Sequence, residues 1–236
     1  MKKMEHGDMA TRTESVRSSE SEVRVREPRY KRPFDLAVLA AAHLLLAPVW
    51  LVLWVAIPLA IKRDDGGPVF YSQKRVGKGG KQFTVRKFRS MVINAEKGTG
   101  AVWASRDDPR ITRIGRLLRH TALDELPQVL NVWTGDMSLV GQRPERPQLH
   151  EQFTAQTPEF EKRLNTRPGM AGMAQVYGEY DLSPPDKLTY DLQYIRSMSM
   201  FLDIKLIILA AVNTVLARWG HATGNTSAPT PETLKT

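Results

Sequence analysis

The sequence predicts an α/β protein that is attached to a membrane by a re-entrant helix–break–helix hairpin. A small β-hairpin region and several amphipathic interfacial helices complete the predicted fold. Three observations support this class. One long apolar run covers residues 36–61, a glycine turn separates two alternating segments within residues 69–89, and several later segments have helical periodicity. At 236 residues the chain is long enough for one main domain with appendages.

Composition excludes some chemistries and favours one kind of partner. The chain has no cysteine, which excludes disulfides, thiolate nucleophiles and cysteine-ligated metal sites. The net charge of +9 predicts an anionic partner, which is nucleic acid, an anionic membrane surface or a phosphorylated substrate. Charge alone does not select among these three.

The two ends of the chain are polar and poor in large apolar side chains. We predict disordered tails over residues 1–29 and 219–236, because such segments bury too little surface to offset the entropy of ordering. Residues 30–63 then form the re-entrant membrane helix, and residues 64–218 form a cytoplasmic domain.

The apolar run has no formal charge and exceeds the roughly 20 residues that a bilayer crossing requires. Lys31–Arg32 precede it and Lys62–Arg63 follow it, which places both ends on the cytoplasmic face. Pro48 near its middle interrupts the helical hydrogen bonds. These signals favour a hairpin that enters and leaves by one face over the alternative, an ordinary transmembrane helix with a proline kink.

A β-hairpin is predicted next, from Val69–Val76 and Gln82–Arg89 around the turn Gly77–Gly80. It carries seven cations, each of which alone is typical of a solvated strand face: Lys74, Arg75, Lys78, Lys81, Arg86, Lys87 and Arg89. We predict a mobile loop over residues 94–105.

The segment Asp107–Pro109 predicts a helix start, with acidic capping candidates and a proline suited to the first turn. An arginine recurs at every third position of this helix, at Arg110, Arg113, Arg116 and Arg119. Two interpretations stay open: a membrane-surface helix whose arginines meet lipid phosphates, or one in which some arginines turn inward.

The acidic pair Asp124–Glu125 follows these arginines. Pro127 is tolerated in the first turn of a helix, so the next helix begins close to Asp124, a candidate N-cap. The positive end of that helix favours carboxylates and bound phosphate alike. The pair is therefore either a cap with ion pairs to Arg116 and Arg119, or a site that handles phosphate and metal.

Further turns and helices follow. Gly135 ends a helix and precedes a short apolar strand and a rigid arginine turn that ends at Pro144. The small residues of Arg167–Val176 permit close backbone approach. Residues 186–197 and 201–219 have helical patterns, and the second is interfacial or packed.

Several motifs in this order resemble those of the bacterial sugar transferase family, the monotopic polyprenyl-phosphate phosphoglycosyl transferases. The resemblance covers about residues 30–217 and indicates a short, catalytic-domain-only form. It rests on Lys31–Asp35, Gly67–Tyr71, Lys87–Met91, Leu123–Gln128, Gly135–Gly141, Arg167–Gly169 and Leu202–Lys205.

The resemblance implies transfer of a sugar-1-phosphate from a UDP-sugar to undecaprenyl phosphate, with release of UMP, at the cytoplasmic face of the bacterial inner membrane. It further implies that Asp124 is the nucleophile that forms a covalent phosphosugar intermediate. Glu125, together with Asp124, would bind Mg²⁺. Arg119 and Arg143 match the phosphate-binding arginines of the family, and Lys87 and Arg89 are further candidates. The resemblance also supports re-entry at Pro48, and makes the reaction the first membrane step of glycan assembly.

Three departures from the family pattern stand out. Ala47 replaces a serine whose hydroxyl helps the membrane break. Gln142 replaces a proline, which predicts a less rigid arginine turn. Gly178–Tyr180 stands where the family has an arginine, which concerns a substrate contact and the identity of the donor sugar.

The competing hypothesis is a membrane-anchored basic scaffold that binds nucleic acid or lipid without catalysis. No nucleic-acid-binding motif occurs, so we expect no nucleic-acid partner and expect anionic lipids around the basic surface. The sequence leaves the donor sugar, the glycan pathway and the oligomeric state open.

Overall fold

The computed structural model describes residues 26–97, 108–178 and 182–216, which form helices around two small sheets. The predicted C-terminal tail and most of the predicted N-terminal tail and mobile loop lie outside these ranges. Within the predicted N-terminal tail, Glu27 is described, and its carboxylate pairs with Lys78 at 2.9 Å and with Arg167 at 3.0 Å. At least this residue of the predicted tail is therefore held by contacts with the rest of the fold.

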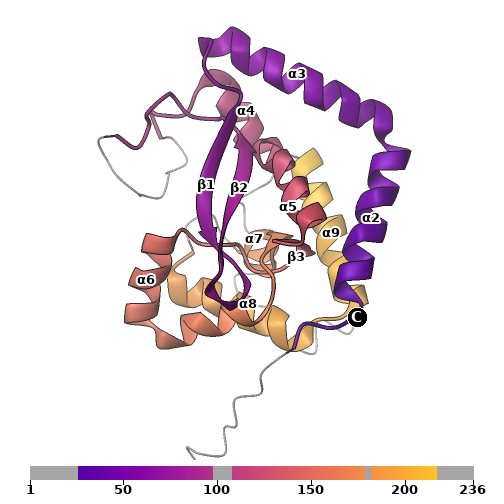
Figure 1. Ribbon diagram of the computed structural model, residues 1–236, viewed down its shortest axis with the longest axis vertical. Coiled ribbons are helices and arrows are strands. Elements are labelled where there is room, and N and C mark those ends of the chain that lie inside the picture. Colours follow the sequence, from indigo (N-terminus) through magenta and orange to yellow (C-terminus); the bar gives the residue numbers. More distant parts are fainter. Residues whose placement is uncertain (1–25, 98–107, 179–181, 217–236) are drawn as a thin grey trace, which may run out of the picture.

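The apolar run forms a broken helix, with α2 over Lys31–Leu45 and α3 over Ala47–Asp65, bent by 83° (Figure 1). No single described helix has the length and apolar composition to cross a membrane. Among the described helices, this bent pair has both when its two helices are taken together. The break lies at Leu46, and Pro48 occupies the first turn of α3, where its missing N–H is tolerated. The predicted break is confirmed, but the two arms meet near a right angle rather than folding back on each other.

Aromatic side chains hold the break on its inner side. The rings of His43 and Trp50 stack with centroids 4.3 Å apart, and Trp50 Nε1 donates to the Ala42 carbonyl at 3.2 Å. These contacts bridge the break in a chain whose Ala47 lacks the hydroxyl common in the family. The outer side of the break exposes large apolar residues: Leu44, Leu45, Leu46, Val49, Leu51, Val52 and Val55.

The predicted β-hairpin is confirmed. Strands β1 (Phe70–Val76) and β2 (Gln82–Phe88) pair antiparallel, joined by the short 3₁₀ turn η1 (Lys78–Gly80). Tyr71 lies opposite Lys87, and Arg75 lies opposite Phe83. Because side chains alternate along a strand, these residues share one face of the hairpin.

The arginine-rich helix α4 covers Arg113–His120 and starts later than the sequence predicts. Asp108 does not cap it but accepts a hydrogen bond from Arg110 Nε at 2.8 Å. The cap is Thr112, whose hydroxyl accepts from the Gly115 N–H at 3.0 Å. The predicted start at Asp107–Pro109 is therefore wrong, because the local ion pair uses the acidic group.

The acidic pair lies in a 3₁₀ segment, η2 (Leu123–Gln128), which leads into α5 (Val129–Thr134). Ala122, in the left-handed conformation with φ 54°, precedes η2, so the prediction of Asp124 as N-cap is wrong. Gly135, with φ 88°, ends α5 as predicted.

The second sheet joins two distant glycine motifs. Strands β3 (Ser138–Val140) and β4 (Gly169–Ala171) are parallel. A Cβ atom on Gly169 would lie 2.0 Å from the Gly141 nitrogen, so only glycine fits there. The predicted close approach of backbones is confirmed.

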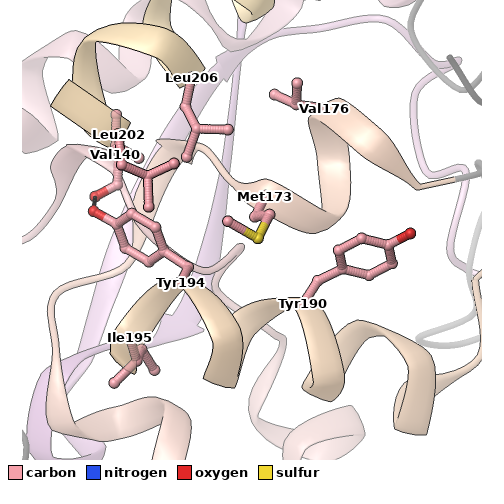
Figure 2. Packing of buried hydrophobic residues seen from close by; sticks show 8 residues of the cluster. All are labelled: Val140, Met173, Val176, Tyr190, Tyr194, Ile195, Leu202 and Leu206. Atoms are coloured by element: carbon pink, nitrogen blue, oxygen red, sulfur yellow. Dashed lines mark hydrogen bonds between the residues drawn. The ribbon is translucent and has the colours of Figure 1, made fainter. Parts of the chain in front are cut away.

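The rest of the chain packs below and beside the hairpin (Figure 1): α6 (Pro147–Gln156), η3 (Pro158–Asn165), α7 (Met173–Tyr177), α8 (Pro184–Ser197) and α9 (Met200–Val215). Helices α8 and α9 confirm the two predicted late helices. In the core between them Met173 lies between Tyr190 and Tyr194 (Figure 2). The Tyr194 hydroxyl donates to the Val140 carbonyl at 3.3 Å.

A buried polar network ties the first described helix to the last. Lys31 Nζ donates to the Val140 carbonyl at 2.7 Å, to the Tyr194 hydroxyl at 2.7 Å and to Asp203 Oδ2 at 3.2 Å. Asp35 accepts from the Ser138 hydroxyl at 3.0 Å. Lys31 and Asp203, two charges beside apolar helical segments that are far apart in the sequence, are thus partners of each other.

Candidate active site

The site is assembled on the acidic pair by three separate elements. Lys87, near the end of β2, places Nζ 2.6 Å from Glu125 Oε1. Arg143, in the turn after β3, donates from Nη1 to Glu125 Oε2 at 3.0 Å and from Nη2 to Oε1. Asp124 lies beside this cluster and is only 6% exposed. Four residues predicted to act together therefore meet.

The ion pairs predicted from sequence are different from those found. Among the described residues, Glu125 pairs with Lys87 and Arg143, whereas the side chain of Arg116 is exposed. The charge of Arg119 acts instead on Asp124. Within the described ranges no side chain donates a hydrogen bond to Asp124. Among the described residues, the charges of Lys87, Arg119 and Arg143 act on its carboxylate.

Environment separates the pKa values of the two neighbouring carboxyls. Burial, together with the negative charge of Glu125, raises the pKa of Asp124 to about 6, against the opposing charges of Lys87, Arg119 and Arg143. Burial also acts on Glu125, but the contacts with Arg143 and Lys87 hold its pKa well below the usual value. Paired carboxyls with pKa values pushed apart are typical of two different chemical roles. Asp124 is still mostly ionised at pH 7.

One further basic residue lies near the site, and the sequence did not distinguish it from the other cations of the hairpin. Arg75 donates from Nη1 to the Pro144 carbonyl at 2.8 Å, beside Arg143. Burial and the charge of Arg143 lower its pKa to about 10. Arg75 pairs with Phe83, a buried residue on the same hairpin face as Lys87. This pairing could have distinguished Arg75 from the exposed cations of the hairpin.

Arg89 does not join the site. Its guanidinium pairs with Asp65 at the end of α3, and Nε donates to the Pro68 carbonyl at 2.6 Å. These contacts fix the link between α3 and the hairpin. The structure therefore gives Arg89 a different position from the phosphate-binding one that the sequence suggested.

Gln142, at the position where the family has a proline, is anchored by its side chain. Its side chain is buried, and Nε2 donates to the carbonyls of Arg163 at 2.6 Å and Thr166 at 3.0 Å. The Thr166 hydroxyl donates back to Oε1 at 3.0 Å. Three side-chain hydrogen bonds therefore anchor the residue that replaces the proline of the family, and the prediction of a less rigid turn stays a prediction.

The acidic pair is too small to enclose a metal ion by itself. The described residues contain no group of three His, Asp or Glu side chains that could hold one. Mg²⁺, however, commonly binds one or two carboxylates and completes its shell with water and substrate phosphates. Asp124 carries no hydrogen bond within the described ranges, and Glu125 Oε2 accepts only one. This donor set fits Mg²⁺ shared with a phosphorylated substrate.

Comparisons with known proteins agree with these features. A family model described as "Bacterial sugar transferase" matches residues 26–218. The chain is 40% identical over 193 residues to a UDP-N-acetylgalactosamine-undecaprenyl-phosphate N-acetylgalactosaminephosphotransferase of Aeromonas hydrophila, covering 80% of this chain and 44% of that protein. It is 42% identical over 200 residues to an undecaprenyl-phosphate glucose phosphotransferase of Komagataeibacter xylinus, covering 80% and 36%.

A third relative is closer in length. It is a UDP-glucose:undecaprenyl-phosphate glucose-1-phosphate transferase of Caulobacter vibrioides, 39% identical over 183 residues that cover 75% of this chain and 67% of that protein. The chain thus spans less than half the length of the first two relatives and two thirds of the third.

Proposed function

Because the chain belongs to the bacterial sugar transferase family, we propose that it transfers a sugar-1-phosphate from a UDP-sugar to undecaprenyl phosphate. The observation that carries this proposal is the state of Asp124. It is a buried carboxylate without a hydrogen-bond donor in the described ranges, and it lies in the field of three cations. A carboxylate of this kind is poised to react rather than to stabilise the fold.

The proposed reaction has two displacements at one phosphorus atom. An oxygen of Asp124 attacks the β-phosphorus of the UDP-sugar, the bond from that phosphorus to the bridging oxygen breaks, and UMP leaves. An oxygen of undecaprenyl phosphate then attacks the same phosphorus and releases the Asp124 carboxylate. The product is the undecaprenyl diphosphate sugar. At a pH above the pKa values of the Asp124 carboxyl and the lipid phosphate, both nucleophiles are already ionised. Neither attack then requires removal of a proton.

The cations divide the electrostatic work. The charges of Arg119 and Lys87 act on Asp124. Arg143 binds Glu125, and more than a third of its side chain is exposed. Positioned cations stabilise the charge on a transferring phosphoryl group, which supplies most of the catalysis in such reactions. Glu125 holds Lys87 and Arg143 in place at the same time.

Mg²⁺ would be held by Asp124 and Glu125 with oxygens of the donor diphosphate. When bound, the ion supplies further charge neutralisation on the phosphates. The carboxylates present fit that role, as described above, and the remaining work falls to the cations of the chain.

We further propose that the bent helix pair attaches the protein to the cytoplasmic face of the bacterial inner membrane. Leu44 and Leu45 at the break are each 80% exposed, and the outer side of α3 continues this apolar surface. Apolar patches of this extent mark membrane or protein contacts. The basic ends of the pair, at Lys31–Arg32 and Lys62–Arg63, favour entry and exit by one face.

The central test is capture of the covalent intermediate. Detergent-purified protein is incubated without acceptor with each of a panel of UDP-hexoses and UDP-N-acetylhexosamines. The protein is then digested, and the masses of its peptides are measured by mass spectrometry. We expect a sugar-phosphate adduct on the peptide with Asp124, and one equivalent of UMP. Glu151→Gln, at an exposed carboxylate of α6, is the control and should label normally. UMP release without any adduct at Asp124 would remove the nucleophile assignment.

Topology is tested separately, with cysteines introduced near both ends of the cysteine-free chain. We expect neither to react with an impermeant reagent outside intact cells. Labelling of the N-terminal cysteine alone would show that the apolar run spans the membrane.

A further inference from the structure

Arg75 on β1 holds the turn that carries Arg143. Its Nη1 donates to the Pro144 carbonyl at 2.8 Å, and its Nη2 donates to Gln73 Oε1 at 2.5 Å. Both acceptors are neutral. One arginine therefore clamps the backbone next to Arg143 against the hairpin face that also bears Lys87.

The same face of the hairpin makes a second connection to the turn that carries Arg143. Gln73 Nε2 donates to the Tyr71 hydroxyl at 2.9 Å, and that hydroxyl donates to Glu96 Oε1 at 3.0 Å. Glu96 in turn binds Arg146, three residues after Arg143. We name these five residues, Arg75, Gln73, Tyr71, Glu96 and Arg146, the turn brace.

The turn is held on both sides of Arg143. The turn brace contacts Pro144 and Arg146, which follow Arg143, and the side chain of Gln142, the residue before it, donates to the carbonyls of Arg163 and Thr166. The Arg143 side chain is 38% exposed and reaches Glu125 through two hydrogen bonds. Whether it can reach Glu125 depends on where the backbone of the turn places it.

Arg75 also contributes charge. Among the described residues no carboxylate lies within ion-pair distance of Arg75. The positive charge of Arg143 and the negative charges of Glu145 and Glu125 act on it from farther away. A half-buried guanidinium whose hydrogen-bond acceptors are both neutral is stabilised by an anion brought into direct contact with it. Guanidinium groups near a phosphate site are favoured for binding phosphate oxygens. An anion bound beside Arg143 would supply such a direct contact.

We propose that Arg75 is a positioning residue for the diphosphate of a nucleoside diphosphate donor. It acts through the Pro144 carbonyl, which sets Arg143 toward the phosphates, and its own charge strengthens the field there. The inference rests on the proposed function, since it names a further residue of the same phosphate site.

The experiment compares binding of uridine, UMP and UDP with donor kinetics in Arg75→Gln and Arg75→Lys. We expect Arg75→Gln to weaken UDP binding at least tenfold, to weaken UMP less and to leave uridine unchanged, because the lost effect is directed at phosphate. Arg75→Lys should fall between, since it keeps the charge but cannot hold both acceptors at once. KM for the donor should rise in the same order.

Arg86→Gln is the matched control. Arg86 lies on β2 with an exposed side chain on the opposite face of the hairpin, so the substitution removes the same charge without touching the brace. Binding of all three ligands should stay within twofold of wild type. Should Arg75→Gln not fold, Glu96→Gln loosens the brace from its other end, and weaker UDP binding with unchanged uridine binding is again required.

Two results overturn the inference. One is equal weakening of uridine and UDP, which indicates a general structural role. The other is a lower melting temperature with unchanged UDP affinity. Failure of the proposed function is a separate outcome: the wild-type protein would release no UMP from any donor, while the affinities of UDP and uridine could still be compared between variants.

Discussion

Replacing Asp124 by Asn should abolish turnover and at the same time stabilise the protein at neutral pH. The buried carboxyl has a pKa of about 6, whereas its ordinary value is 3.8. The fold therefore prefers the protonated form, and ionisation of Asp124 weakens it. Asparagine has nearly the same shape and carries no charge at any pH.

The size of this effect follows from the two pKa values. A difference of one pKa unit corresponds to about 1.4 kcal/mol, so ionised Asp124 destabilises the fold by about 3 kcal/mol as an upper estimate. For a chain of this length about 3 kcal/mol corresponds to a rise of about 8 °C in melting temperature.

The sign of the effect depends on pH. Below about pH 4 the carboxyl is protonated in both folded and unfolded chains, so Asp124→Asn and wild type should be equally stable. As pH rises through about 6 the wild type loses stability and the variant does not. Unfolding is measured in detergent from pH 4 to 8, with UMP release assayed at pH 7.5.

Glu125→Gln is the control with the opposite sign. The pKa of Glu125 is held low by Arg143 and Lys87, so its charge stabilises the fold above about pH 4.5. Breaking a buried ion pair costs about 3–5 kcal/mol, and the partial exposure of Arg143 reduces this to about 2 kcal/mol at pH 7. An Asp124→Asn protein that is less stable than wild type at pH 7, or that still releases UMP, would refute the reasoning.

Three further predictions follow from the site and its support. The value of kcat/KM for UMP release should fall tenfold per pH unit below about pH 6, as Asp124 becomes protonated, and a pH-independent rate would count against that role. Chelation of divalent ions should stop UMP release and added Mg²⁺ should restore it, whereas full activity in excess chelator would exclude Mg²⁺. Gly169→Ala should prevent β3 and β4 from pairing and lower the melting temperature markedly, because its Cβ would meet the Gly141 nitrogen at 2.0 Å; Gly79→Ala, with open space around it, should cost only about 1 kcal/mol. Equal stability of the two glycine variants would contradict that packing.

Features determined by neighbouring residues were predictable from the sequence. The break near Pro48, the hairpin around the glycine turn and the end of α5 at Gly135 depend on local backbone preferences, and the structure confirms all three. The resemblance to the family, now shown, directed attention to Asp124 and Glu125. Their roles are still predictions.

Features determined by distant partners were not predictable. Nothing local shows that Arg89 binds Asp65, or that Glu125 pairs with Lys87 and Arg143. The same limit explains Gln142, whose three hydrogen bonds need residues more than 20 positions away. Charge and spacing identified the basic groups, and only tertiary contacts separate those in the site from those that secure the fold.

The contact between Lys31 and Asp203 places a condition on how the chain is made. Lys31 belongs to the first described helix, and its buried ammonium has its carboxylate partner 172 residues later, on α9. While the ribosome is still translating the middle of the protein, that ammonium must stay in contact with water, because burial without a partner is too costly. The base of α2 can therefore settle only after α9 has emerged, so folding finishes with the last described helix rather than proceeding from the first.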